Sequence, residues 1–266
     1  MRRIMIIFSG LLILLASCQI KTKTNPNEHL VMATLYQQTA AEYRALCYQA
    51  FNLGRWQLQA MLDTLQSKKK PAVIVDIDET VLDNSPYEGY VIKTGYSYPA
   101  GWKEWVKAAQ AEPVPGALEF LTFADRQGVD IFYVSNRRAE NQAWTMKNLK
   151  KVGFPQVTDD HMFLRTITSS KEERRQAIQK THTILLLFGD NLNDFASVFE
   201  NKSIDDRFKA ADEFRSQFGR RFIVLPNAMY GEWEGAIYNY NWSAKPAKKS
   251  QMRLNALRYF KMHDLQ

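Results

Sequence analysis

Four acidic residues follow one short apolar run in the first third of the chain. The run AVIVD ends at Asp76, and Asp78, Glu79 and Asp83 come soon after it. Carboxylates this close repel one another, so a folded protein gathers them only where something positive is held. Side chains alternate along a strand, so Asp76 and Asp78 can face the same ligand. The alternative is an ordinary strand-to-helix turn in which Asp78 or Thr80 caps a helix.

Polar residues also end two later apolar runs and open one helix-like segment. VDIFYVSN ends with Ser135 and Asn136, a hydroxyl and an amide able to hold anionic oxygens. TILLLFGD ends at Asp190, and Asp194 follows in GDNLND. Lys171 begins KEERR. Each cluster alone is typical of a turn or a solvated surface. Only their combination indicates a functional site.

Taken together, these residues predict phosphoryl-transfer chemistry. Acids from two strand ends, without a nearby His or Cys, suit a hard cation with oxygen ligands such as Mg²⁺. A lysine beside the same acids suits a bound phosphate. A metal ion, a phosphate and a carboxylate nucleophile are the parts that a reaction through an aspartyl-phosphate needs. The four histidines lie outside these clusters, and no Arg-His-Gly signature is present, so a histidine-type phosphatase is not expected.

The apolar runs themselves predict the fold that would position these residues. Short β-branched and aromatic runs alternate with helix-like segments at 138–151 and 169–180, which indicates a doubly wound, Rossmann-like α/β domain with a parallel sheet. Ligands of such folds bind at the carboxyl ends of the strands, where the polar clusters lie. The expected strands are 72–76, 129–136, 183–190 and 222–226.

The first 18 residues have the features of a bacterial lipoprotein signal peptide. Two arginines precede an apolar run, and Leu-Ala-Ser stands directly before Cys18. The alternative is a plain secretory signal in which Cys18 is incidental. A lipidated Cys18 would attach the exported chain to a membrane of the bacterial cell envelope. Gln19 favours the outer membrane over the inner one. Only Cys47 then remains, so no internal disulfide is expected.

The rest of the chain predicts one folded unit behind a polar tether at 19–28. Apolar residues at helical spacing predict an N-terminal helical segment over 29–70, packed on a core formed by 71–266. An aromatic-rich insertion at about 84–128 predicts a small helical cap. The net charge of +7 is spread out, apart from SKKKP and KPAKKS, which we interpret as solvated surface. This charge favours small anionic substrates, and no nucleic-acid partner is expected.

The motifs resemble those of a known superfamily. DIDET, VSN, Lys171 and GDNLND, in this order, resemble the four motifs of the haloacid dehalogenase (HAD) superfamily. DETVLDNSPY, YVSNRR and LPNAMYGEWEG are similar to the class C acid phosphatases, bacterial surface lipoproteins that include 5′-nucleotidases. The resemblance covers about residues 30–260, includes the lipidation motif and implies the HAD fold.

The resemblance also implies a role for each motif residue. Asp76 would be the nucleophile and a metal ligand. Asp78 would be the general acid and then the general base, and its backbone carbonyl would join Asp76 and Asp190 on Mg²⁺. Ser135 and Lys171 would hold the phosphoryl oxygens.

Further residues would support this site. Asp194 would orient Lys171 or the waters on the metal, with Asn136 and Arg174 in supporting positions. Trp102 and Tyr230 occupy the stretches in which family members place aromatic residues around the base of the substrate. For these two, packing in the core or the cap is the alternative.

We therefore expect a lipid-anchored, Mg²⁺-dependent acid phosphatase that hydrolyses phosphomonoesters, with nucleoside 5′-monophosphates as its preferred substrates. One alternative is a broad-specificity phosphatase without nucleotide preference. A second is a non-catalytic surface-binding lipoprotein on the same fold, which the intact Asp76, Asp78, Lys171 and Asp190 argue against. The sequence leaves assembly into a homo-oligomer open.

Overall fold

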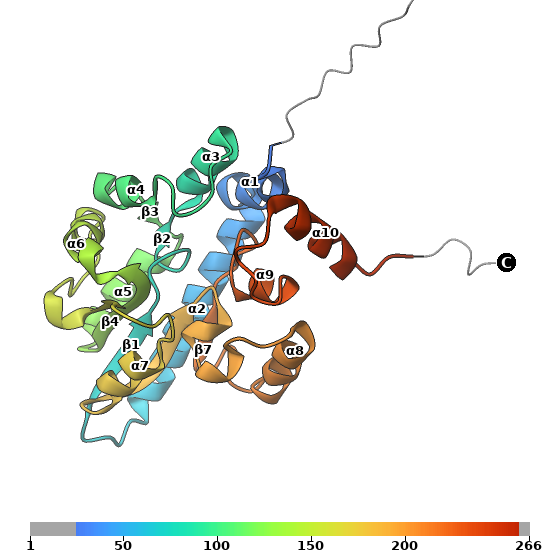
Figure 1. The fold of residues 1–266 in the computed structure, drawn as a ribbon. Helices are drawn as coiled ribbons and strands as arrows, with labels where there is room; N and C mark the ends of the chain where they lie inside the picture. The colour runs from blue at the N-terminus through green and yellow to red at the C-terminus, as the bar shows by residue number, and fades with distance from the viewer. Residues whose placement is uncertain (1–24, 261–266) are drawn as a thin grey trace, which may run out of the picture.

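A five-stranded parallel sheet forms the centre of the computed structural model, which describes residues 25–260 (Figure 1). The strand order is β5-β4-β1-β6-β7, with β1 paired to both β4 and β6. This arrangement confirms the predicted α/β class. The strands are β1 (Lys70–Val75), β4 (Asp130–Arg138), β5 (Met162–Arg165), β6 (His182–Gly189) and β7 (Phe222–Val224).

The four predicted strands correspond to β1, β4, β6 and β7, whereas β5 was not predicted. A second sheet of two short antiparallel strands, β2 (Leu82–Asp83) and β3 (Glu112–Pro113), lies outside the main one. The α-helices are α1 (Val31–Thr39), α2 (Ala41–Asp63), α3 (Ser85–Thr94), α4 (Trp102–Ala108), α5 (Ala117–Arg126), α6 (Gln142–Lys151), α7 (Glu172–Gln179), α8 (Ile204–Glu213), α9 (Glu232–Ile237) and α10 (Pro246–Ala256). The short 3-10 turns are η1 (Glu28–Leu30), η2 (Ala139–Asn141), η3 (Asp159–His161), η4 (Leu192–Asp194) and η5 (Ser197–Phe199).

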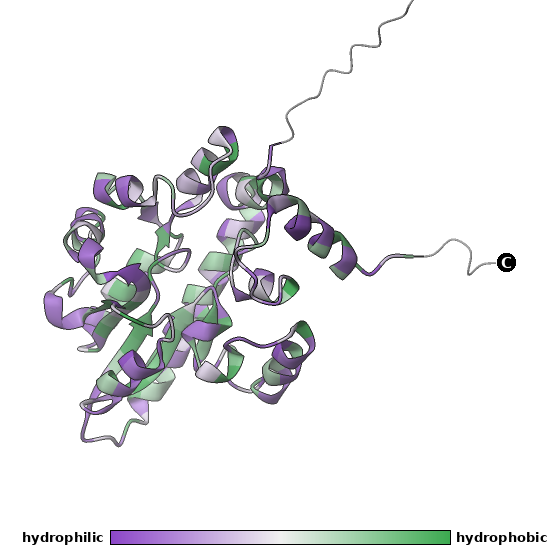
Figure 2. Cartoon of the chain, viewed as in Figure 1, coloured by the Kyte–Doolittle hydropathy of each residue, from purple (hydrophilic) through white to green (hydrophobic). Residues whose placement is uncertain are grey.

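Alternate residues of the central strands face opposite sides of the sheet and belong to two separate apolar clusters. Val73 and Val75 of β1 pack with residues of α2 and α5, whereas Ala72 and Ile74 pack with residues of α7 and α8. Figure 2 shows these strands at the hydrophobic end of the scale, between helices of mixed character. Burial on both faces explains why the strands read as continuous apolar runs.

The helix α2 covers one face of the sheet. Its Phe51 ring stacks on Phe188 of β6, with ring centroids 5.4 Å apart. Gly54 stands where any Cβ would collide with the Phe188 ring, so a glycine is needed for this close approach. The residues directly after Phe188 belong to the polar edge of the sheet. The packing of α2 therefore supports the strand that carries them.

The range 84–128 contains α3, α4 and α5, but these helices do not form one unit. Phe120 and Leu121 of α5 are buried against the sheet, so α5 belongs to the core layer. Only α3 and α4, with the β2–β3 pair, remain for the small helical cap. The C-terminal boundary of the cap, which we expected near residue 128, therefore lies before α5.

No helix within the described residues 25–260 has the length and apolar character that crossing a membrane requires. The predicted signal peptide, Cys18 and most of the tether lie outside this range.

Candidate active site

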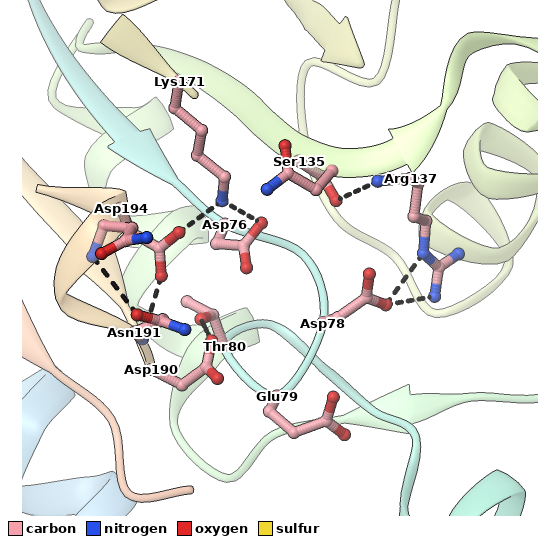
Figure 3. Close-up of polar contacts among 12 residues, drawn as sticks. Asp76, Asp78, Glu79, Thr80, Ser135, Arg137, Lys171, Asp190, Asn191 and Asp194 are labelled. Atoms are coloured by element: carbon pink, nitrogen blue, oxygen red, sulfur yellow. Dashed lines mark hydrogen bonds and ion pairs between the residues drawn. The ribbon is translucent and has the colours of Figure 1, made fainter. Parts of the chain in front are cut away.

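The carboxyl ends of β1, β4 and β6 bring the predicted residues to one edge of the sheet. Asp76 directly follows β1, Ser135 lies near the end of β4, and Asp190 directly follows β6. Carboxylate oxygens of Asp76, Asp190 and Asp194 all lie within 4.8 Å of one another. Figure 3 shows these side chains directed toward a shared space beside Lys171. Parallel strand pairing thus assembles a cluster of three acids from distant parts of the sequence.

Lys171 is the cation of this cluster. Its Nζ lies 2.6 Å from Oδ1 of Asp76 and 2.6 Å from Oδ1 of Asp194, and its side chain is almost wholly buried. Burial by itself lowers the pKa of Lys171, but the charges of Asp194 and Asp76 outweigh it and raise the pKa. The ammonium group is therefore charged and held at the start of α7, where it faces the end of β1.

One lysine does not neutralise three carboxylates. Burial, together with the charges of Asp194 and Asp78, raises the pKa of Asp76 to about 7 despite the presence of Lys171. Burial and the charges of Asp194 and Asp76 also raise the pKa of Asp190 well above its ordinary value. Excess negative charge among oxygen donors is the environment that a hard divalent cation relieves. The residues present therefore fit the metal ion that the sequence motifs predict.

Neighbouring polar groups fix Asp190 in place. Thr80 donates a hydrogen bond to its Oδ1 over 3.1 Å, and Asn227 donates to its Oδ2 over 2.8 Å. Each donor satisfies one carboxylate oxygen, so the group has a single well-defined orientation. Thr80, which the sequence assigned only to a turn, thus contacts an acid of the three-acid cluster directly.

Asp194 is held by the turn that follows Asp190. The backbone N–H of Asn191 donates to Asp194 Oδ2 over 3.0 Å. Gly189 lies directly behind, where an added Cβ would overlap the side chain of Asp194. The turn after β6 therefore places the carboxylates of Asp190 and Asp194 close together. A glycine is needed at position 189 because a larger residue would collide with Asp194.

Asp78 points away from the three-acid cluster. Its Oδ1 accepts hydrogen bonds from Nε of Arg137 over 2.9 Å and from Nδ2 of Asn84 over 2.8 Å. The Arg137 side chain is only 1% exposed and is itself held by the side-chain oxygen of Asn84. Figure 3 shows this pair on the opposite side of the β1 loop from Lys171. The Asp78 carboxylate is thus kept apart from the cluster by its partners.

Arg174 holds the end of β4. Its Nη1 donates to the backbone oxygen of Ser135 over 2.6 Å, and its Nη2 donates to Oδ1 of Asn136 over 2.8 Å. Ser135 is buried and its hydroxyl accepts from the backbone N–H of Arg137. Arg174 therefore fixes the strand end that presents Ser135, whereas the Asn136 side chain contacts Arg174.

The two aromatic residues singled out in the sequence contact positioning residues. Trp102, in α4 of the cap, lies over the Arg137 guanidinium at 5.5 Å from the ring centroid. The hydroxyl of Tyr230 donates a hydrogen bond to the buried carboxylate of Glu79. Both rings thus belong to the surroundings of the DIDET segment.

Sequence reasoning missed four residues that shape the site: Glu79, Asn84, Arg137 and Asn227. Glu79 is fully buried, has a left-handed backbone with φ of 54°, and accepts a hydrogen bond from the Asn84 backbone over 2.8 Å. A signal for Arg137 existed, because it stands two positions after Ser135 and so shares its side of the strand. Asn227 lies in the LPNAMYGEWEG stretch, but nothing in the sequence indicated that it would contact Asp190.

Comparison with known proteins agrees with this geometry. Residues 16–233 match the family model described as the HAD superfamily, subfamily IIIB (Acid phosphatase). The structure is similar to that of the class C acid phosphatase from Bacillus anthracis, with a TM-score of 0.87 and 44% sequence identity. That match covers 90% of this chain and 100% of the other. A second structure of the Bacillus anthracis enzyme, with tungstate bound, gives the same values.

Curated plant proteins are more distant relatives. The stem 28 kDa glycoprotein of Glycine max is 28% identical over 178 residues, and acid phosphatase 1 of Solanum lycopersicum is 25% identical over 166 residues. The matches cover 62% and 59% of this chain, and 62% and 57% of those proteins. The chain therefore spans about three fifths of the length of these relatives.

Proposed function

The chain belongs to the acid phosphatases of HAD subfamily IIIB, and from this premise we propose that it hydrolyses phosphomonoesters through a phosphorylated Asp76. One observation carries the proposal: Asp76 stands at the end of the central strand, 2.6 Å from Lys171, among the carboxylates of Asp190 and Asp194. A carboxylate nucleophile, a buried cation and a metal-type acid cluster at one sheet edge are the parts of this reaction.

Asp76 and Asp190 would hold Mg²⁺, with the backbone carbonyl of Asp78 as a third ligand. The ion would offset the negative charge of the phosphoryl oxygens and orient the phosphate for attack. The crowding of carboxylates with raised pKa values supports this assignment, because a divalent cation relieves their repulsion.

In the first step, a carboxylate oxygen of Asp76 attacks phosphorus. An oxygen–phosphorus bond forms to Asp76, and the bond from phosphorus to the leaving alcohol oxygen breaks. Lys171 and the hydroxyl of Ser135 hold the equatorial oxygens, where negative charge is spread in the transition state. The ion pair between Lys171 and Asp194 keeps the ammonium group in place for this contact.

Asp78 carries the proton in both steps. Its carboxyl group protonates the leaving oxygen, and the resulting carboxylate then takes a proton from the water that attacks the phosphorylated Asp76. Inorganic phosphate leaves, and Asp76 and Asp78 return to their starting states. The contacts with Arg137 and Asn84 would fix the direction of the Asp78 carboxyl group for these proton transfers.

For the substrate, we propose nucleoside 5′-monophosphates. Trp102 of the cap makes an edge contact with Tyr87, at 4.9 Å between ring centroids, and stands over Arg137 beside the site. An aromatic group at this place could accept the flat base of a nucleotide. Comparing kcat/KM for adenosine monophosphate and phenyl phosphate distinguishes this preference from broad specificity. Similar values for both substrates contradict the nucleotide proposal.

We also propose export and lipid attachment at Cys18. The apolar run, the small residues and the cysteine occur in the order that a lipoprotein signal requires. Incorporation of a labelled fatty acid by cells that make the full chain tests it. The label should be lost in Cys18→Ser, and labelling of both forms contradicts the assignment.

The decisive experiment measures phosphate release with and without a metal chelator, in the wild type and in Asp76→Asn. We expect metal-dependent turnover in the wild type and a loss of at least about 1,000-fold in the variant, as for removal of a catalytic nucleophile. Asp205→Asn is the matched control, because Asp205 is exposed on α8. Turnover that survives in Asp76→Asn contradicts the mechanism. Absence of turnover in the wild type favours a non-catalytic binding protein.

A further inference from the structure

The last helix of the described chain is strongly basic. The stretch 235–260 contains five Lys or Arg and no acidic residue, and α10 occupies its centre. A helix of this charge attracts anionic surfaces and repels cationic ones. This stretch includes KPAKKS, which we interpreted from the sequence as solvated surface.

Large apolar side chains at the end of this segment are exposed to solvent. Leu254, Leu257, Tyr259 and Phe260 are between 60% and 75% exposed. Single exposed apolar residues are common, but four within seven positions form an unusual group. Leucines and aromatic residues beside lysines and arginines are the composition of segments that lie at the boundary between lipid headgroups and acyl chains.

One face of α10 is fixed to the protein body. Arg253 donates a hydrogen bond to the hydroxyl of Tyr238 over 2.6 Å. Lys249, one turn earlier, lies over the rings of Tyr238 and Trp242. These contacts set the rotation of the helix, so Lys248 and Leu254 remain exposed on its outer side. The contacts of Arg253 and Lys249 therefore hold α10 in place, with Lys248 and Leu254 directed to solvent.

The described chain begins beside this helix. Figure 1 shows its start, α1 and α10 on the same side of the molecule. Burial lowers the pKa of His29 in η1, and the charges of Arg253 and Lys249 lower it further, so η1 and α10 are electrostatic neighbours. Asn27 fixes this start through a 2.7 Å hydrogen bond to the backbone oxygen of Val91.

Cys18 precedes Asn25 by seven residues, which reach at most about 25 Å when fully extended. A lipid on Cys18 would therefore keep this side of the molecule close to the bilayer. Met32 of α1 is a further exposed apolar side chain, at 74%.

We propose that α10 and residues 257–260 dock on an anionic lipid surface, as a second membrane contact beside the lipid at Cys18. The proximity to the bilayer rests on the proposed lipidation, whereas the charge and the exposed apolar groups belong to the described residues. Docking would fix the orientation of the enzyme on the membrane, which a single lipid attachment at Cys18 would not.

Two other occupants fit these observations less well. A nucleic acid would neutralise the bases but would leave Leu254 and Leu257 without a partner. A symmetric contact with a second copy would bring two α10 helices together, and a segment with no acidic residue would then repel its equal. An anionic bilayer offers negative headgroups to the lysines and arginines and an apolar interior to Leu254 and Leu257.

The test places an environment-sensitive dye on Leu257→Cys in the full chain, purified in detergent and reconstituted into vesicles. The unsubstituted chain, labelled in parallel, gives the background from its own cysteines. Vesicles contain phosphatidylcholine alone or phosphatidylcholine with phosphatidylglycerol. We expect a blue-shifted emission, and quenching by a lipid-bound quencher, in the vesicles with phosphatidylglycerol only.

Two triple variants separate specific docking from general attraction. Replacing Lys245, Lys248 and Arg258 with Ala should reduce the dye shift at least about tenfold, because each base near an anionic surface contributes to binding. The matched control replaces three exposed lysines elsewhere, Lys147, Lys150 and Lys180, and should keep the shift.

Three outcomes overturn the proposal. The first is an absence of the shift, and the second is an equal shift with both lipid compositions. The third is a shift that already occurs in detergent and grows with protein concentration, which indicates self-association. None of these measurements uses phosphatase activity, so failure here is distinguishable from failure of the proposed reaction.

Discussion

Nη2 of Arg137 lies 2.8 Å from Oδ1 of Asp78, and Arg137 Nε lies 2.9 Å from the same oxygen. The residues are 59 positions apart, and the guanidinium is almost wholly buried. This pair fixes the direction of the carboxylate that we propose as the proton donor. Arg137 is therefore a positioning residue for the reaction.

Arg137→Lys should lower kcat about 10- to 100-fold for alkyl phosphates, which need a protonated leaving group, because lysine lacks the guanidinium fork. The loss should be smaller for nitrophenyl phosphate, whose leaving group departs readily without a proton. KM should change little. Steady-state kinetics on both substrates measures this, with the exposed neighbour Arg138→Lys as control. An equal loss on both substrates would assign Arg137 to phosphate binding or to folding.

Added Mg²⁺ should raise the melting temperature of the wild type. Binding at a hundredfold excess over Kd stabilises by about 2.7 kcal/mol, which corresponds to roughly 5–10 °C for a chain of this size. Asp190→Asn removes a proposed ligand and should abolish the shift, whereas Asp205→Asn should keep it. Thermal unfolding with and without the ion measures the effect. A full shift in Asp190→Asn rejects the proposed metal site.

Gly189→Ala should reduce both activity and stability. The new Cβ would overlap the side chain of Asp194, which must move away from Lys171 or displace the end of β6. Overpacking of this kind costs about 1–3 kcal/mol. Gly89→Ala is the matched control, since the nearest atom to its added Cβ is 3.9 Å away and the position lies within α3. It should be neutral or slightly stabilising. Unchanged kcat and melting temperature in Gly189→Ala contradict the proposed constraint.

Glu88 should make the protein less stable as the pH rises. Burial, with a smaller effect of the Glu234 charge, raises the pKa of Glu88 from 4.5 to about 7. The folded protein thus binds this proton more tightly than the unfolded chain does. Stability is highest below the unfolded pKa, falls as the pH rises between the two values, and is lowest above the folded pKa.

Glu88→Gln should therefore raise the free energy of unfolding by about 1–3 kcal/mol at about pH 8, with little change at about pH 4. Urea unfolding at both pH values measures the difference. The exposed Glu119→Gln on α5 should have no such effect. An equal change at both pH values would show that the amide acts through packing and not through the proton.

The sequence predicted the sheet and its polar edge because both depend on local patterns. Apolar runs buried on both faces are continuous, and Asp76 and Asp190 follow directly from the ends of such runs. The edge strand β5 was missed because its apolar run, MFL, is only three residues long and shorter than those of the predicted strands. Lys171 was identified only through its motif, since nothing local distinguishes it from a surface lysine.

The positioning contacts could not be predicted, because they join residues that only the fold brings together. Tyr230 and Glu79 are 151 positions apart, and Asn227 and Asp190 are 37 apart. Glu79 also adopts a left-handed backbone, which is rare for a glutamate and has no sequence signal. In the sequence, Glu79 was one of four closely spaced acids. In the fold, its buried carboxylate accepts hydrogen bonds from Asn84 and Tyr230.

The close packing of Gly54 against Phe188 also limits the order in which contacts can form while the chain is synthesised. Helix α2 is synthesised early, but the ring it packs on belongs to β6, which emerges much later. Until then Phe51 can pack on Phe120 of α5 but lacks the Phe188 ring. A contact so distant in sequence costs loop-closure entropy, so we expect the packing of α2 on β6 to form after its packing on α5. A chain arrested before Phe188 would leave part of the apolar face of α2 exposed, and exposed apolar surface of this kind promotes aggregation.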